Sequence, residues 1–209
     1  MPATTENRPV GPSTYAGLFL VALATLMYEI LLTRIFSVIM FYHFAFMAIS
    51  VAMFGMTVGS IVVYLRPQQF GPEKVLDQLV RNTLGFALTV LLSVIVFVNY
   101  QARPDQPFSL AQAVLLISIS LPFVFSGICV CLALTRVGGS VGKMYAADLG
   151  GAALGCLFLM ATLKFTDGLT AVFVVAWIAL IAAMCFAANT AWARFRDTFG
   201  LLACAGAGL

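Results

Sequence analysis

The chain has 209 residues, of which 62% are hydrophobic and only 9% are charged, and its formal net charge is +3. A soluble domain carries roughly a quarter charged residues, so this composition excludes an ordinary soluble protein. The few positive charges are dispersed along the chain and form no patch typical of nucleic-acid binding. The composition therefore predicts a protein whose main partner is the lipid bilayer and which binds no nucleic acid.

Apolar runs of about 20 residues, the length that crosses a bilayer as a helix, recur along the whole chain. They are continuous and rich in Leu, Ala and Gly, whereas the strands of a membrane barrel alternate between apolar and polar residues. We expect an all-α, polytopic transmembrane helix bundle. Its six spans are predicted at residues 14–34, 38–65, 83–100, 108–135, 144–165 and 168–191.

Three further segments complete this scheme. Residues 1–13 are polar and Pro-rich, and we expect a disordered cytoplasmic leader there. Residues 72–82 place their apolar side chains on one helical face, which predicts a short interfacial helix at the inner leaflet. The chain turns apolar again at Phe199 and stops at Leu209, so we expect the start of a seventh span and further chain beyond residue 209. The predicted transmembrane domain covers residues 14–209.

The distribution of Lys and Arg predicts the orientation, because cytoplasmic loops carry an excess of both. With the N-terminus in the cytoplasm, the outer connections hold only Arg103 and Lys164. The remaining cations, apart from Arg34 in the first hairpin, then fall on the cytoplasmic side: Arg8, Arg66, Lys74, Arg81, Arg136, Lys143, Arg194 and Arg196. The sequence therefore predicts an N-in topology.

Ionisable residues inside spans are informative because each is costly in lipid unless it is paired or hydrated. Glu29 lies past the middle of the first span, Arg34 follows five residues later, and Tyr42 and His43 open the second span. Three interpretations remain open for this group: a salt bridge that joins the first two helices, a substrate or proton site, and side chains that reach for the outer interface.

Asp148 lies near the cytoplasmic end of the fifth span and is therefore expected to be far from Glu29. It is interpreted either as an acid that favours the helix N-terminus or as a docking or ligand contact at the cytoplasmic side. Two small-xxx-small patterns predict close helix packing. They are Gly55 with Gly59 in the second span, and Gly151 with Gly155 in the fifth.

Recognisable catalytic and metal-binding patterns are missing from the sequence. The five cysteines lie in apolar runs without a CxxC spacing, so we expect small buried side chains. A single histidine excludes an HExxH zinc site and a bis-histidine haem site, and neither a Walker loop nor a GxSxG motif occurs. We predict no catalytic residue, metal site or cofactor in this chain.

Two stretches of the sequence carry motifs of a known family. LFLVALATLMYEILLTRIFSVIM (residues 18–40) contains early YE and TR pairs and is followed by a span that ends in GMTVGS. This stretch resembles the opening helical hairpin of the membrane-embedded spermidine synthase-like proteins of bacteria. KMYAADLGGAALGCL (residues 143–157) resembles a later helix with an A-A-D-L-x-G-A-x-x-G pattern. The order of the two stretches and the number of spans between them also fit.

The resemblance implies a multi-span domain in the bacterial inner (plasma) membrane, followed by a cytosolic Rossmann-like domain similar to aminopropyltransferases, which use decarboxylated S-adenosylmethionine. The residues for that chemistry are not among these 209 positions, so the enzyme assignment stays open for this chain. The implied role is to anchor the cytosolic domain and to handle a polyamine-like or lipid-soluble ligand. The alternatives are a small secondary transporter, motivated by Glu29, Arg34 and His43, and a non-catalytic accessory subunit of a larger membrane complex.

Overall fold

The structure is a computed structural model that describes residues 11–39, 43–71, 74–99, 110–137 and 140–188, without the side chains of residues 39, 43–45 and 110–112. The described residues form six helices and no strand. The helices are α1 (Pro12–Ile39), α2 (His43–Leu65), α3 (Val75–Asn99), α4 (Leu110–Thr135), α5 (Val141–Phe165) and α6 (Gly168–Ala187).

All six helices are long enough and apolar enough to cross a membrane. The shortest, α6, has 20 residues, which gives about 30 Å of helix at 1.5 Å per residue, the thickness of a hydrocarbon core. A helix satisfies its own backbone hydrogen bonds, as a segment in lipid must. The predicted all-α bundle of six spans is confirmed, and the chain is a multi-pass membrane protein.

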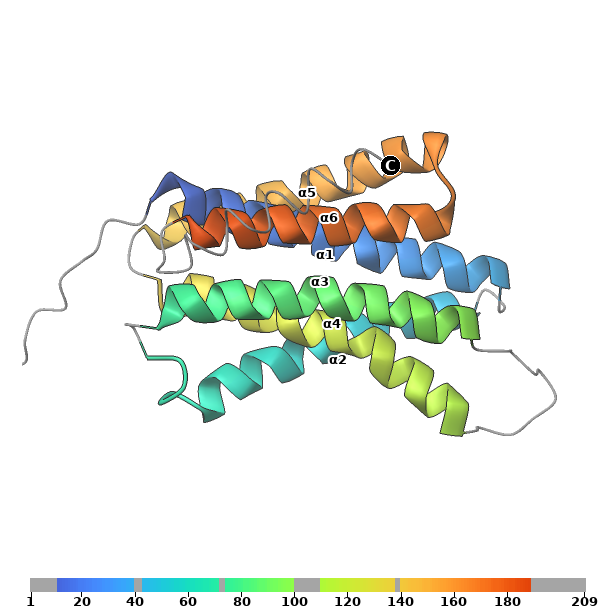
Figure 1. Cartoon of the computed structure of the whole chain (residues 1–209), viewed down its shortest axis with the longest axis horizontal. Helices are drawn as coiled ribbons and strands as arrows, with labels where there is room; N and C mark the ends of the chain where they lie inside the picture. Colours follow the sequence, from blue (N-terminus) through green and yellow to red (C-terminus); the bar gives the residue numbers. More distant parts are fainter. Residues whose placement is uncertain (1–10, 40–42, 72–73, 100–109, 138–139, 189–209) are drawn as a thin grey trace, which may run out of the picture.

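The helices pack around α1. This helix contacts α5 and α6 along its length and also reaches α2 and α4, while α3 packs on α4 and α6, and α2 packs on α4. In Figure 1, α1, α5 and α6 lie in the upper half of the bundle, and α2, α3 and α4 lie in the lower half. In the most apolar 18-residue stretch of α1, 61% of the residues are buried, whereas in the corresponding stretch of α5 only 17% are buried. Therefore α1 is the central helix and α5 lies at the periphery.

The prediction of a separate interfacial helix at residues 72–82 was wrong. One continuous helix, α3, runs from Val75 to Asn99. Val75, Leu79 and Val80 are buried and pack in one cluster with Phe70 and with residues of α4. The apolar face of this segment therefore lies against the bundle, because burial there removes it from both water and lipid head groups.

Several predicted segments lie outside the described residues. They are residues 1–10 of the leader, 40–42 of the second span, 72–73 of the predicted interfacial helix, 100 of the third span, 108–109 of the fourth, 189–191 of the sixth, and the seventh span expected from Phe199. Residues 12 and 13, which we assigned to the leader, belong to the first turn of α1.

Candidate functional site

Glu29 lies in the second half of α1 and is half-buried, and Arg34 lies five residues further along the same helix and is exposed. Within the described part of the chain, neither side chain makes a hydrogen bond or an ion pair. Tyr42 lies outside the described residues, as does the side chain of His43, the first residue of α2. The predicted group of Glu29, Arg34, Tyr42 and His43 therefore stays a prediction.

Asp148 lies in the second turn of α5 and is also half-buried. It has no ion-pair or hydrogen-bond partner among the residues that the structure describes. Gly151, three residues later, lies against Phe19 of α1. This contact sets the register of α5 against α1, and with it the separation of Asp148 from Glu29 along the bundle axis. Glu29 is ten residues beyond Phe19 in the same direction, which places it about 20 Å from Asp148 along the bundle axis at 1.5 Å per residue. The two acids belong to different levels of the membrane.

The glycines of α5 bring two helix backbones together. A β-carbon on Gly155 would lie 2.7 Å from the Leu23 carbonyl oxygen in α1, and one on Gly151 would collide with the Phe19 carbonyl oxygen. Both distances are shorter than the contacts that real β-carbons make. Phe19 and Leu23 are four residues apart, as Gly151 and Gly155 are, so α1 and α5 run in the same direction and meet along one seam.

A second glycine seam joins α2 and α4. A β-carbon on Gly55 would lie 2.7 Å from the Ser120 carbonyl oxygen, and one on Gly59 would collide with the Val124 carbonyl oxygen. From the other side, a β-carbon on Gly127 of α4 would lie 2.5 Å from the carbonyl oxygen of Met56. Gly127 was not singled out from the sequence, because it has no second small residue at the required spacing on its own helix face.

The core also holds a buried hydrogen bond between Tyr28 of α1 and Ser93 of α3, with 2.6 Å between the oxygen atoms. The Ser93 hydroxyl lies 2.6 Å from the Val90 carbonyl and donates its one proton there. The Tyr28 hydroxyl must therefore donate to Ser93, and its oxygen keeps a free acceptor position. The Tyr28 ring packs on Phe123 of α4, with 5.3 Å between the ring centroids.

Two more buried polar contacts join the central helices. Thr25 of α1 donates to the Val21 carbonyl at 2.7 Å, so Ser126 of α4 donates to Thr25. The Thr83 hydroxyl of α3 donates to the Leu79 carbonyl at 2.8 Å, and the Cys129 sulfur of α4 lies 3.4 Å from the Thr83 oxygen. Each contact links α4 to another helix. The sequence did not predict these contacts, because a hydroxyl group in an apolar run does not indicate which residue it will bond. The pairing becomes visible only once the helices are packed.

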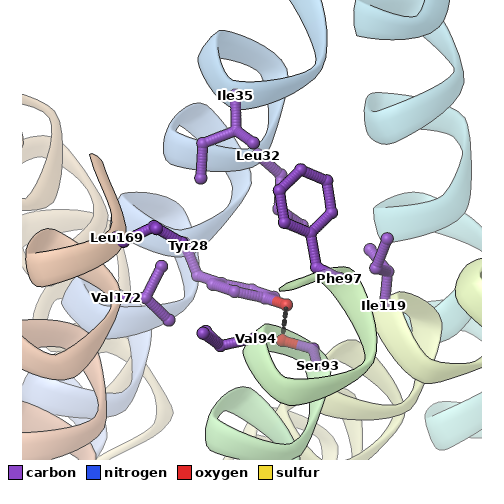
Figure 2. Close-up of a pocket in the computed structure, with 9 residues that line it drawn as sticks. All are labelled: Tyr28, Leu32, Ile35, Ser93, Val94, Phe97, Ile119, Leu169 and Val172. Atoms are coloured by element: carbon purple, nitrogen blue, oxygen red, sulfur yellow. Dashed lines mark hydrogen bonds between the residues drawn. The ribbon is translucent and has the colours of Figure 1, made fainter. Parts of the chain in front are cut away.

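A small cavity adjoins Tyr28 and Ser93. It measures about 10 Å³ and is otherwise lined by apolar side chains from α1, α3, α4 and α6. Figure 2 shows the Tyr28 ring crossing it from α1, with the hydrogen bond to Ser93 at one side and Phe97 above. It lies toward the ends of α1 and α3 that are remote from the N-terminus of α1.

Comparison with family models, with curated proteins and with solved structures gave no match to this chain. The described residues contain no group of three or more His, Cys, Asp or Glu side chains that is arranged to hold a metal ion. Cys129, Cys131, Cys156 and Cys185 are free thiols, buried or half-buried, and Cys204 lies outside the described part.

Proposed function

We propose that this chain is the integral membrane domain of a spermidine synthase-like protein and holds an aminopropyltransferase-like domain at the inner face of a bacterial plasma membrane. The observation that carries the proposal is the packing of the two stretches that resemble this family. The first lies in α1 and the second in α5, and Gly151 and Gly155 of the second contact Phe19 and Leu23 of the first. The residues that carry the resemblance thus form one structural unit.

The packing of the core supports an anchoring role over a conducting one. Glycine seams fix α1 to α5 and α2 to α4, and the buried hydroxyl groups are paired within the bundle. The polar contacts at Thr83 and Ser93 are ten residues apart on α3, or about 15 Å at 1.5 Å per residue. Each contact joins two helices, and among the described residues no direct hydrogen bond connects one contact to the other.

The charges at one end of the bundle support the proposed orientation. Four exposed cations lie in or beside the turns that join α2 to α3 and α4 to α5, and a fifth lies in the second turn of α3; these segments are at the same end as the start of α1 (Figure 1). We call this the basic end: Arg66, Lys74, Arg81, Arg136 and Lys143. By the positive-inside rule the basic end faces the cytoplasm, where a cytosolic domain would dock.

A small transporter is the second candidate, because Glu29 and Asp148 are both half-buried within spans. A carboxylate at the centre of a membrane helix costs about 3 kcal/mol on insertion scales, so such groups often serve a substrate. Uptake of radiolabelled putrescine into proteoliposomes tests this candidate. Loss of uptake in Glu29→Gln and Asp148→Asn, with uptake retained in the exposed-loop control Asp167→Asn, would favour transport over anchoring.

The test of the leading proposal uses the complete gene product. The reading frame that encodes this chain is expected to encode an aminopropyltransferase-like domain as well. Membranes that contain the product are expected to transfer an aminopropyl group from decarboxylated S-adenosylmethionine to putrescine. A reading frame without such a domain would overturn the proposal. A domain that is present but inactive would leave the anchoring role and remove the polyamine substrate.

A further inference from the structure

One face of α3 is uncovered and carries cations at one end and aliphatic side chains along the rest. The helix packs on α4 and α6, whereas Arg81, Leu88 and Ile95 are exposed. These three are spaced seven residues apart, so each is turned by only about 20° from the last. Lys74 is exposed seven residues before Arg81, and its carbonyl oxygen accepts the Gln78 N–H at 2.9 Å, which extends the helical geometry to it. We call this set the outward face of α3: Lys74, Arg81, Leu88, Leu92 and Ile95.

Arg81 lies further from the end of its helix than the other cations of the basic end. Arg66 and Arg136 directly follow the last residues of α2 and α4, and Lys143 is the third residue of α5. Arg81 is the seventh residue of α3, about 9 Å along the helix at 1.5 Å per residue. The whole of Val75–Asn99 is long and apolar enough to be a membrane span. A cation at this depth is costly unless it reaches a polar group near the membrane surface.

The described part of the chain provides no partner for the Arg81 guanidinium. Its side chain forms no ion pair and no hydrogen bond with a described residue. Asp77 lies one turn earlier on α3 and is half-buried, but no ion pair joins its carboxylate to Arg81. The five N–H donors of a guanidinium match the oxygens of a phosphate group. The groups left for these donors are water and lipid head groups, and of these the lipid phosphate carries the opposite charge.

The local charge favours one class of lipid. Among the described residues at this end of α3, the two cations Lys74 and Arg81 and the single acid Asp77 leave a net charge of +1. This charge repels the ammonium group of a zwitterionic head group and attracts a head group with a net negative charge. Leu88 begins about 10 Å beyond Arg81 along the helix and is 66% exposed, and Ile95 is 59% exposed. An acyl chain therefore meets an aliphatic surface below the cations.

We infer that the outward face of α3 binds an anionic phospholipid of the cytoplasmic leaflet. Its phosphate lies between Lys74 and Arg81, and one acyl chain lies along Leu88, Leu92 and Ile95. This interaction is independent of the proposed function, because it requires neither a cytosolic domain nor polyamine chemistry. It gives the membrane domain a lipid partner that is selected by the charge of its head group.

A single tryptophan at position 88 reports which lipid lies on this face. In the full chain, Trp177→Phe and Trp192→Phe remove the native tryptophans, and Leu88→Trp introduces the fluorophore. Vesicles of phosphatidylcholine contain an equal minor fraction of either dibrominated phosphatidylglycerol or dibrominated phosphatidylcholine, whose bromine atoms quench tryptophan on contact. From the dependence of quenching on that fraction, phosphatidylglycerol should bind about fivefold more tightly, the ratio that one net charge provides at a membrane surface.

A control position separates this site from general contact with lipid. Met53 is 65% exposed on α2, and α2 contains no Lys or Arg. Met53 and Leu88 both lie about 20 Å from the basic end of their helices at 1.5 Å per residue. Met53→Trp in the same background should therefore show no preference between the two lipids.

Four variants test the charges themselves. Arg81→Gln or Lys74→Gln should each remove the preference at position 88. Asp77→Asn should raise it by about another fivefold, a gain that a folding defect cannot produce. Lys143→Gln makes the same charge change on α5, which does not pack on α3, and should have no effect. Equal binding of both lipids at position 88, a preference that survives in Arg81→Gln, an equal loss in Lys143→Gln, no gain in Asp77→Asn, or the same preference at position 53 would each overturn the inference.

Discussion

Gly151 of α5 lies directly against the backbone carbonyl oxygen of Phe19 in α1, whereas its neighbour Gly150 faces the edge of the Phe19 ring. A β-carbon on Gly150 would lie 3.7 Å from that ring, which is an ordinary van der Waals distance. A β-carbon on Gly151 would overlap a backbone atom, which cannot rotate away. Two adjacent glycines thus differ in what they permit, and the difference tests the α1–α5 seam.

We expect Gly151→Ala to destabilise the bundle by about 1–3 kcal/mol, because the added methyl group must push α5 away from α1. Gly150→Ala should be close to neutral, or stabilising by up to about 1 kcal/mol, since alanine is the better helix former. Equilibrium unfolding in mixed detergent micelles measures both free energies. Equal effects of the two substitutions would contradict the described register of α1 and α5.

The seam between α2 and α4 predicts a pattern of non-additivity. Gly59→Ala and Gly127→Ala each force the same two helices apart, so the double variant should lose less stability than the sum of the single losses. Gly59→Ala combined with Gly151→Ala affects two different seams, and these losses should add within about 0.5 kcal/mol. The same unfolding measurement applies. Additive losses for Gly59 and Gly127 would show that they do not share one interface.

The hydrogen bond between Thr25 and Ser126 should appear as a coupling energy. In a double-mutant cycle of Thr25→Val and Ser126→Ala, we expect a coupling of about 0.6 kcal/mol, with about 1.7 kcal/mol as the upper range for such bonds in membranes. Thr57 provides the control, because it is exposed and donates only to its own helix at Met53. The cycle of Thr57→Val with Ser126→Ala should show no coupling. A coupling energy of zero in both cycles would show that Thr25 and Ser126 do not share a hydrogen bond.

The basic end should determine the orientation of the chain in the membrane. Changing Arg66, Lys74, Arg136 and Lys143 to Gln removes most of the charge bias, and we expect a mixture of two orientations. Protease protection of a C-terminal epitope tag in inverted vesicles measures the fraction of each. Changing Arg34 and Lys164 to Gln, which removes cations from the opposite half, should leave the native orientation intact. A single orientation in all variants would contradict the role assigned to these charges.

The sequence predicted the spans because their signal is local: each is a continuous apolar run of sufficient length, and the structure confirms six. The boundary of α3 was misplaced because the amphipathic pattern at residues 72–82 shows an apolar face but not its neighbour, which proved to be the bundle. Glu29 and Asp148 were recognised as polar groups at membrane depth. Tyr28 and Ser93 were not, because the pairing of two hydroxyl groups 65 residues apart depends on how α1 and α3 pack.

The most direct test of the account is the sidedness of two connections on opposite ends of the bundle. In a chain whose five cysteines are replaced by alanine, Gln68→Cys marks the turn between α2 and α3, and Asp167→Cys marks the turn between α5 and α6; both positions are exposed. A membrane-impermeant maleimide should label residue 167 in intact spheroplasts and residue 68 only in inverted vesicles. Labelling of both from the same side would contradict the six-span bundle, and the reverse pattern would place the basic end outside and remove the inner-face docking role.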